Sequence, residues 1–230
     1  MNKNTITVSS HQPNFIPWVG FWNKLINSDI FVLATGIQFV RRSFGNRVIM
    51  SDNNSWATIP VIFKFDSYDK ILISDMNAVN QIGRRIIHWS NQKKYKYSDR
   101  LTPIIERFIK NDENNLCKLN IDLIKLILKQ INHTSTKLII DNTLWKDQNK
   151  NNMISALVNK YGNTYMSGAS VKKYLSRNDI NDIKYVYVQK IDSDIGVETI
   201  LHTIAFEKNP IEFINKSATW NLWEISKSNI

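Results

Sequence analysis

The sequence predicts an α/β protein whose mostly parallel sheet is flanked by helices. A strand, a loop, a helix and a second strand follow one another over residues 5–34, and a helix between two strands favours parallel pairing. Strand-like and helix-like segments alternate again from residue 137 to about 206, which is typical of α/β architecture. The 230 residues suffice for one well-buried core, so we expect a single α/β domain over residues 1–230.

The first elements follow from β-branched runs and one amphipathic stretch. "TITVS" and "DIFVLA" predict buried strands, and a helical stripe of apolar residues lies between them, with Pro17 at the first helical position. "RVIM" and "WATIPVIF", separated by the turn-forming "SDNNS", predict a β-hairpin near residues 47–62. "KILIS" adds a further strand.

A helical insertion is expected over about residues 77–132. It has breaks near "KKYKYSD" and "NDENN", and "LCKLNIDLIKLILKQI" is its strongest amphipathic element. Beyond it, "KLIID", "TYM" and "KYVYV" predict strands that alternate with helices at about 150–161, 168–176 and 197–206.

Composition restricts the class of protein and suggests an anionic partner. Hydrophobic residues make up 43% of the chain and aromatic residues 11%, which is unlike a disordered protein, and no apolar run is long enough to span a membrane. The N-terminus lacks the apolar core of a signal peptide, and the single cysteine, Cys117, excludes an internal disulfide, so we expect a cytoplasmic protein. The net charge of +10 suggests nucleic acid, a phosphorylated metabolite, an acidic protein or a membrane surface as partner, although an AT-rich genome produces the same excess of lysine.

The loop "HQPNFIPW" after the first strand is the first candidate site. Ligands of open α/β sheets bind outside the carboxyl ends of the strands, where this loop is expected. His11 titrates near neutrality, while Gln12 and Asn14 can donate and accept hydrogen bonds. The alternative is architectural, with His11 closing the strand end and Trp18 filling the core.

The same residues carry a resemblance to a known family. "HQPNFIPWVGFWNKLINSDIFVL", followed by "IQFVRRSFGNRVIM" and "WATIPV", resembles the start of the WbqC-like proteins, a bacterial family encoded among genes for surface polysaccharide synthesis. "YMSGASVKKYL" resembles a later part of the family pattern. The chain departs from that pattern at Ala34, Thr35 and Gly36, where two aspartates are expected.

The resemblance implies a role in making O-antigen or capsule. The favoured activity is an acyl- or aminoacyltransferase that forms an amide on an amino sugar carried on a nucleotide. The acyl donor would be a carrier-protein thioester, coenzyme A or an aminoacyl-tRNA, and no bound cofactor is expected. Two alternatives stay open: a noncatalytic protein that binds a nucleotide sugar or a partner in the same pathway, and a nucleic-acid-binding module.

Roles within this mechanism follow from side-chain chemistry. An amine must lose a proton before it attacks an acyl carbonyl, and His11 is the expected base. Gln12 and Asn14 would orient the base or the sugar, and N–H groups at the helix starts near Pro17 or Gly168 would stabilise the oxyanion. Arginine suits diphosphate oxygens, so Arg47 would hold phosphate. Because the first two strands should pair in parallel, we expect His11 and Arg47 to face the same cavity.

Further substrate contacts are expected in two segments. In "VRRSFGNR", Arg42 is a second candidate for phosphate and Asn46 for a sugar hydroxyl, although either could belong to a solvated turn. In "YMSGAS", the candidates are Tyr165, Ser167 and Gly168, although a serine there is also an ordinary helix cap.

A basic and aromatic segment is the candidate docking surface. "RRIIHWSNQKKYKY" could receive an acidic acyl carrier protein, a charged tRNA or other nucleic acid, or it could be a solvated helix face. The proposed docking residues are Arg84, Arg85, His88, Lys93 and Lys94.

No metal site is expected. Asp192 and Asp194 match the Asp-x-Asp spacing of metal-dependent glycosyltransferases, but acidic residues ahead of a helix also stabilise its dipole, and we prefer that interpretation. Cys117, His133 and His202 have no supporting neighbours in the sequence, and Cys117 is expected in the core. The chain carries no paired Cys or His pattern for zinc and no phosphate-binding glycine motif.

Overall fold

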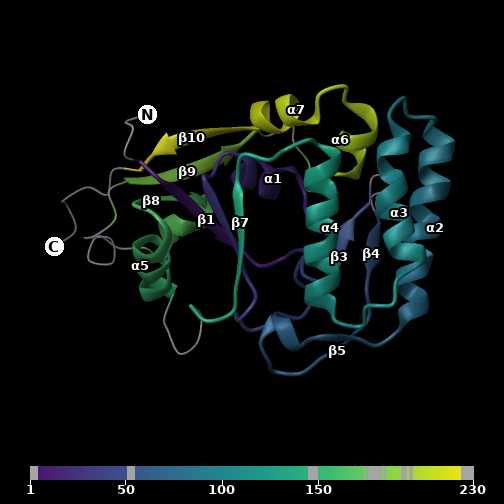
Figure 1. Ribbon diagram of the computed structural model, residues 1–230, viewed down its shortest axis with the longest axis horizontal. Helices are drawn as coiled ribbons and strands as arrows, with labels where there is room; N and C mark the ends of the chain where they lie inside the picture. Colours follow the sequence, from purple (N-terminus) through teal and green to yellow (C-terminus); the bar gives the residue numbers. More distant parts are fainter. Residues whose placement is uncertain are drawn as a thin grey trace.

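The computed structural model describes residues 5–50, 55–144, 150–173, 175, 183, 185–192, 196 and 199–223. It confirms the α/β class: a six-stranded, mostly parallel sheet with helices on both faces and two small antiparallel sheets (Figure 1). The large sheet has the order β10-β9-β8-β1-β2-β7 and consists of β1 (Thr7–His11), β2 (Ile30–Ala34), β7 (Lys137–Asp141), β8 (Thr164–Gly168), β9 (Tyr185–Ile191) and β10 (Ala218–Leu222). The α-helices are α1 (Val19–Ile26), α2 (Met76–Lys93), α3 (Thr102–Ile109), α4 (Leu116–Gln130), α5 (Lys150–Tyr161), α6 (Leu201–Phe206) and α7 (Pro210–Lys216).

The predicted strand, helix and strand unit at the N-terminus is confirmed. β1 pairs with β2 in parallel, in a register that sets His11 opposite Leu33. Along β2, Phe31 and Leu33 pack in the core that contains α1, whereas Val32 and Ala34 pack in the core that contains α5. Both faces of β2 are therefore covered, which explains why "IFVLA" is continuously apolar.

The chain reverses its direction across the sheet between β1 and β8. From β1 it passes through α1 to β2 and then to β7, and it returns through α5 to β8 and β9 on the other side of β1. In open α/β sheets, ligands bind where such connections diverge, outside the carboxyl ends of the strands. Here those ends are His11 of β1 and Gly168 of β8.

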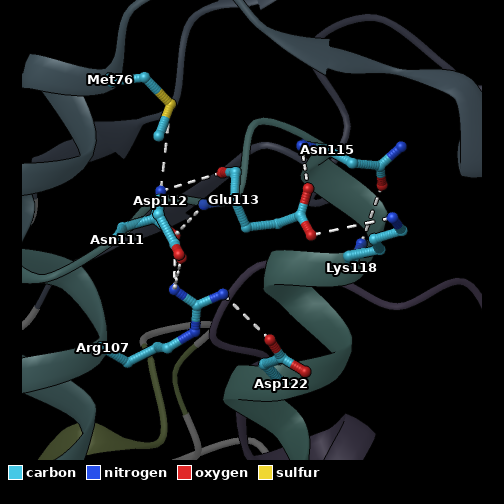
Figure 2. Close-up of polar contacts among 8 residues, drawn as sticks. All are labelled: Met76, Arg107, Asn111, Asp112, Glu113, Asn115, Lys118 and Asp122. Atoms are coloured by element: carbon cyan, nitrogen blue, oxygen red, sulfur yellow. Dashed lines mark hydrogen bonds and ion pairs between the residues drawn. The ribbon is translucent and has the colours of Figure 1, made fainter.

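The predicted helical segment forms α2, α3 and α4, which lie at the opposite end of the molecule from α5 (Figure 1). Both expected breaks are present. The first contains the 3-10 helix η2 (Ser98–Leu101), and the second is closed by polar contacts in which Arg107 reaches from α3 to Asp122 of α4, with 3.0 Å between Nη2 and Oδ2 (Figure 2). Apolar residues of these helices share one buried core with α1 and β2, so the insertion is not packed separately.

The predicted hairpin near residues 47–62 is present in its first part, and its last strand pairs elsewhere. β3 (Arg47–Ile49) pairs with β4 (Trp56–Thr58), which confirms the hairpin, but β5 (Val61–Ile62) pairs instead with β6 (Leu72–Ile73). Pro60 lies between β4 and β5 and has no backbone N–H, so it interrupts the ladder. Most of the predicted "SDNNS" turn, residues 51–54, lies outside the described residues.

Three further expectations differ from the structure, and two elements were not expected. Helix α1 starts at Val19 with Trp18 as its N-cap, so Pro17 precedes the helix and does not occupy its first position. The segment after β8 is a 3-10 helix of five residues, η3 (Ala169–Lys173), and α6 begins at Leu201. α7 and the antiparallel strand β10 were not predicted.

Among the described residues, no helix combines the length and the apolarity needed to cross a bilayer.

Candidate functional site

Two cavities open at the point where the chain reverses direction between β1 and β8. Their volumes are about 650 and 310 Å³. Four residues line both: His11 at the end of β1, Lys24 of α1, Gly168 at the end of β8 and Ser170. The position agrees with the rule for open α/β sheets.

The larger cavity lies beside α1, and the smaller one lies beside α5. Residues from α1, β9 and β10 line the larger cavity, and Lys190 is one of those from β9. Trp18, Lys172 and Trp223 complete this part of the wall. The smaller cavity is lined by Met153 and Ile154 of α5 and by short polar side chains of β1 and β8. Among the described residues that line the two cavities, none is acidic, so the exposed Lys172 and Lys190 give the site a positive potential.

His11 is held in one tautomer. Its Nδ1 lies 3.0 Å from the carbonyl oxygen of Gln12, which can only accept, so Nδ1 carries the proton and Nε2 keeps its lone pair. The ring packs edge-on against Phe21, with 5.3 Å between the centroids. Burial and the charge of Lys24 lower the pKa of His11 to about 3, so the imidazole is neutral at physiological pH.

Lys24 is one of the site residues that the sequence did not reveal, together with Lys172 and Lys190. Its Nζ donates a hydrogen bond of 2.8 Å to the Ser10 carbonyl oxygen and lies 5.8 Å from the centre of the Phe31 ring. The residue is only 7% exposed, and burial lowers its pKa to about 7. A signal was present: Lys24 follows Gly20 by one helical turn, so the two share the face of α1 that meets the sheet.

Two glycines shape the cavity wall. A Cβ atom at Gly168 would meet no other atom within 4 Å, so this position faces open space. A Cβ atom at Gly20 would lie 2.4 Å from the Trp18 ring, so the absence of a side chain lets the indole pack on the first turn of α1. Trp18 therefore forms part of the wall of the larger cavity while it also packs, half-buried, against the core.

The structure brings six of the predicted catalytic and substrate-binding residues to the cavities. His11 lines both; Trp18 lines the larger; Gln12, Tyr165 and Ser167 line the smaller; and Gly168 lines both. Gln12 also donates from Nε2 to the Gln38 carbonyl oxygen at 3.3 Å.

The other four predicted residues lie elsewhere. Asn14 is buried, and Asn46 donates from Nδ2 to the Ile59 carbonyl oxygen at 2.9 Å, so it ties the hairpin to the chain before it. Arg42 is exposed on a turn and has a φ of 60°. The Arg47 guanidinium stacks on Trp56 at 4.2 Å from the ring centre.

The expectation that His11 and Arg47 face one cavity is wrong. Arg47 is not among the residues that line either of the cavities at His11. The parallel pairing of β1 and β2 places only the residues directly after these strands at the same rim. Arg47 lies in β3, which belongs to a separate two-stranded sheet, so the pairing does not constrain its position.

The predicted docking residues lie on α2 and at its C-cap, Lys94, and none of them lines either cavity. α2 lies at the opposite end of the molecule from α5 and β8 (Figure 1). Arg84, His88, Lys93 and Lys94 are exposed. Arg85 is half-buried, and its Nη2 donates to the Ser55 hydroxyl at 2.6 Å, so it anchors the hairpin to α2. Whether α2 receives a partner stays a prediction.

Three of the remaining candidates, Cys117, His133 and His202, make structural contacts. Cys117 is buried, and burial raises the pKa of its thiol to about 12. His133 Nε2 lies 2.7 Å from the Thr136 hydroxyl, and His202 packs against Tyr95 with 5.3 Å between ring centres. Asp192 is exposed, and Asp194 lies outside the described residues. The described residues contain no group of three or more His, Cys, Asp or Glu side chains that could hold a metal ion.

A known family accounts for most of the chain. The sequence model of the WbqC-like protein family matches residues 12–194. The chain belongs to this family. The match to the WbqC-like family includes Lys24, the two glycines of the cavity wall and β8, and it begins at the residue after His11.

One relative is similar over a comparable length. The protein named "Uncharacterized protein Rv1507c" from Mycobacterium tuberculosis (strain ATCC 25618 / H37Rv) is 24% identical over 184 residues, which are 75% of this WbqC-like chain and 76% of the relative. No solved structure matches the chain significantly.

Proposed function

We propose that this WbqC-like protein transfers an acyl or aminoacyl group to the amine of an amino sugar carried on a nucleoside diphosphate. The observation that supports this most directly is the cavity of about 650 Å³, in which a neutral histidine lies beside three lysines and no described acidic residue. Such a lining favours an anionic ligand and also offers a proton acceptor. The product would serve the synthesis of O-antigen or capsule.

Binding of the nucleotide would use the outer part of the larger cavity. Lys172 and Lys190 are exposed on the cavity wall and are suited to the diphosphate, in the role that Arg47 cannot fill from its position on β3. The half-buried Trp18 and Trp223 offer apolar surfaces for the base or the sugar.

The chemical step would take place at the rim shared by both cavities. The sugar amine attacks the acyl carbon, a C–N bond forms, and the bond from the acyl carbon to the sulfur or oxygen of the donor breaks. His11 Nε2 takes the proton that the amine loses and returns it to the leaving thiol or hydroxyl. The acyl chain would enter the smaller cavity beside Met153 and Ile154.

The test is a product assay with defined donors. Purified protein is incubated with an amino-sugar nucleotide and one acyl donor at a time: an acyl-coenzyme A, an acylated carrier protein or an aminoacyl-tRNA. The mass of the sugar product is then measured by mass spectrometry. We expect a product whose mass has increased by one acyl group. Binding of the nucleotide sugar without a product from any donor would favour the noncatalytic alternative.

Variants connect the assay to the site. His11→Gln should lower kcat by about 10²-fold or more, because a positioned base contributes on that order. Lys172→Gln and Lys190→Gln should each raise KM about tenfold, because each removes a cation that would contact phosphate. Lys125→Gln is the matched control, since Lys125 is exposed on α4 and lines neither cavity. Unchanged kcat in a folded His11→Gln protein would refute the assignment of the base.

A further inference from the structure

Lys24 has surroundings that a lysine rarely occupies without a chemical role. The side chain is buried at the rim shared by two cavities, and among the described residues the hydrogen-bond partner of its Nζ is an uncharged group, the Ser10 carbonyl oxygen. No carboxylate among the described residues forms an ion pair with it. Burying an unpaired ammonium is costly, so the amine is readily held in its neutral form there.

The amine is also close to the groups that an addition reaction needs. His11, with the lone pair of Nε2 available, lines the same two cavities. Lys172 and Lys190 place positive charge on the wall of the larger cavity, and Gly168 leaves open space at the rim. A neutral amine in a largely apolar site, next to a proton acceptor, is the usual setting for a lysine that forms a Schiff base.

We infer that Lys24 is a nucleophile that forms an imine with the carbonyl group of an anionic aldehyde or ketone, such as a phosphorylated or nucleotide-linked keto compound, bound in the larger cavity. This activity goes beyond acyl transfer and does not depend on it. The inference rests on the position of the amine in the two cavities and on the cationic wall.

The reaction balances without any further reactant. Nζ attacks the carbonyl carbon, so a C–N bond forms and the carbonyl π bond breaks. His11 takes a proton from Nζ and gives it to the alkoxide, which yields a carbinolamine. The hydroxyl then leaves as water with one proton from solvent, and a protonated imine remains. Its single N–H can keep the hydrogen bond to the Ser10 carbonyl oxygen that Nζ makes in the free protein.

Reductive trapping tests the inference on the intact protein. The probe is pyridoxal phosphate, which carries both an aldehyde and a phosphate, followed by borohydride reduction and peptide mapping by mass spectrometry. We expect Lys24 to be labelled at neutral pH at probe concentrations at which the exposed Lys125 is not. Pyridoxal, which lacks the phosphate, should label Lys24 about tenfold less well, because the cationic wall no longer attracts it.

Two variants make the test specific. Lys172→Gln should reduce labelling of Lys24 severalfold without changing that of Lys125. Gly168→Val should block it, because the added side chain would project into the open rim of the cavity and meets no other atom within 4 Å at its Cβ. Circular dichroism checks that both proteins are folded.

The outcome is decided by which lysine carries the label. If the label spreads over exposed lysines while Lys24 stays unmodified, or if Gly168→Val is labelled like the wild type, the inference is wrong. Labelled Lys24 with no amide product in the donor assay would uphold the imine and reject the transferase, and the opposite pair of results would do the reverse.

Discussion

At the scale of single residues, burial beside the sheet sets the charge of the site. His11 and Lys24 are both bases, and removal from water disfavours the charged form of each. The effect keeps His11 neutral throughout the physiological range. The usual pKa of lysine is 10.5, so the same effect lowers the pKa of Lys24 only to about 7. At neutral pH the cavity therefore contains an uncharged imidazole and an amine of which about half is uncharged and able to attack a carbon.

Replacement of Lys24 should stabilise the protein at neutral pH. The pKa of Lys24 is about 7 in the folded protein and 10.5 in the unfolded chain, so the unfolded state binds more protons between these values and wild-type stability rises with pH across this window. Lys24→Met removes the cost of burying the amine. The substitution also loses the hydrogen bond to Ser10, which offsets part of this gain. The net effect should be a rise of about 2 kcal/mol in the free energy of unfolding at pH 7. Urea denaturation at pH 7 and at pH 9.5 measures the difference between the two proteins, which should shrink at the higher pH.

The control is Lys125→Met, an exposed position where the same comparison should show no dependence on pH. His11 does not interfere, because its pKa values in the folded and unfolded states, about 3 and 6.5, lie below this window. A wild type that is more stable than Lys24→Met at pH 7 would contradict the inferred burial of an unpaired amine.

At the scale of elements, local caps and turns fix where the helices begin. Asn115 is the N-cap of α4: its Oδ1 accepts from the Lys118 backbone N–H at 3.0 Å, and its Nδ2 donates to the Asp69 carbonyl oxygen at 2.7 Å. The preceding turn is closed by Glu113, whose carboxylate accepts from the Asn115 backbone N–H at 2.8 Å (Figure 2). This cap explains why the amphipathic run begins abruptly after "NDENN".

Loss of this cap should be measurable as lost stability. Asn115→Ala removes the cap and also the bond to Asp69, and we expect the free energy of unfolding to fall by about 2 kcal/mol. Lys118→Ala is the comparison, because it keeps the cap and loses only an ion pair of 3.9 Å between Nζ and Glu113 at the surface, which contributes little. Thermal or urea unfolding of both variants checks the prediction. Equal losses in the two proteins would mean that the turn, and not the cap, carries the effect.

At the scale of the whole molecule, a buried polar cluster joins the loop after β1, residues 12–18 (the opening loop), to the helical insertion. The carbonyl oxygens of Pro13 and Gly45 lie 2.7–2.8 Å from Asn120 Nδ2 of α4, whose two N–H groups can donate to both. They also lie 2.8–2.9 Å from the Tyr68 hydroxyl, whose single proton can be donated to one of them. Within the same loop, Ile16 is held at a φ of 38°, which is rare for a β-branched residue and is sustained by surrounding contacts. The opening loop, which follows His11, is therefore positioned by α4, which is distant in sequence.

Disruption of the cluster should loosen the opening loop before the rest of the fold. Asn120→Ala leaves two buried carbonyl oxygens to share the single proton of the Tyr68 hydroxyl, and we expect a loss of about 2 kcal/mol in stability. Amide hydrogen exchange should accelerate about tenfold at the Phe15 N–H, which donates to the Phe44 carbonyl oxygen at 2.9 Å. The amides of α2 should change less. Tyr68→Phe removes the other donor. Because only the double variant leaves both buried carbonyl oxygens without a donor from this cluster, the two substitutions together should cost more than the sum of their separate effects.

The sequence by itself determined the order and type of most elements, and it located one side of the site. Apolar periodicity and β-branched runs predicted β1, α1, β2 and the helical insertion, because these patterns depend on residues only a few positions apart. The loop at His11 and the segment at Gly168 were identified because parallel strands place their carboxyl ends at one edge of the sheet.

Only the tertiary structure decided which distant residues complete that site. Lys24 lies inside an amphipathic helix, where a lysine normally indicates the solvent side, and its burial depends on how α1 packs on the sheet. Arg47 was expected at the cavity but lies in a separate two-stranded sheet. β10 completes the wall of the larger cavity through antiparallel pairing with β9. Contacts of this kind depend on the packing of whole elements against one another, which the local pattern of the sequence does not encode.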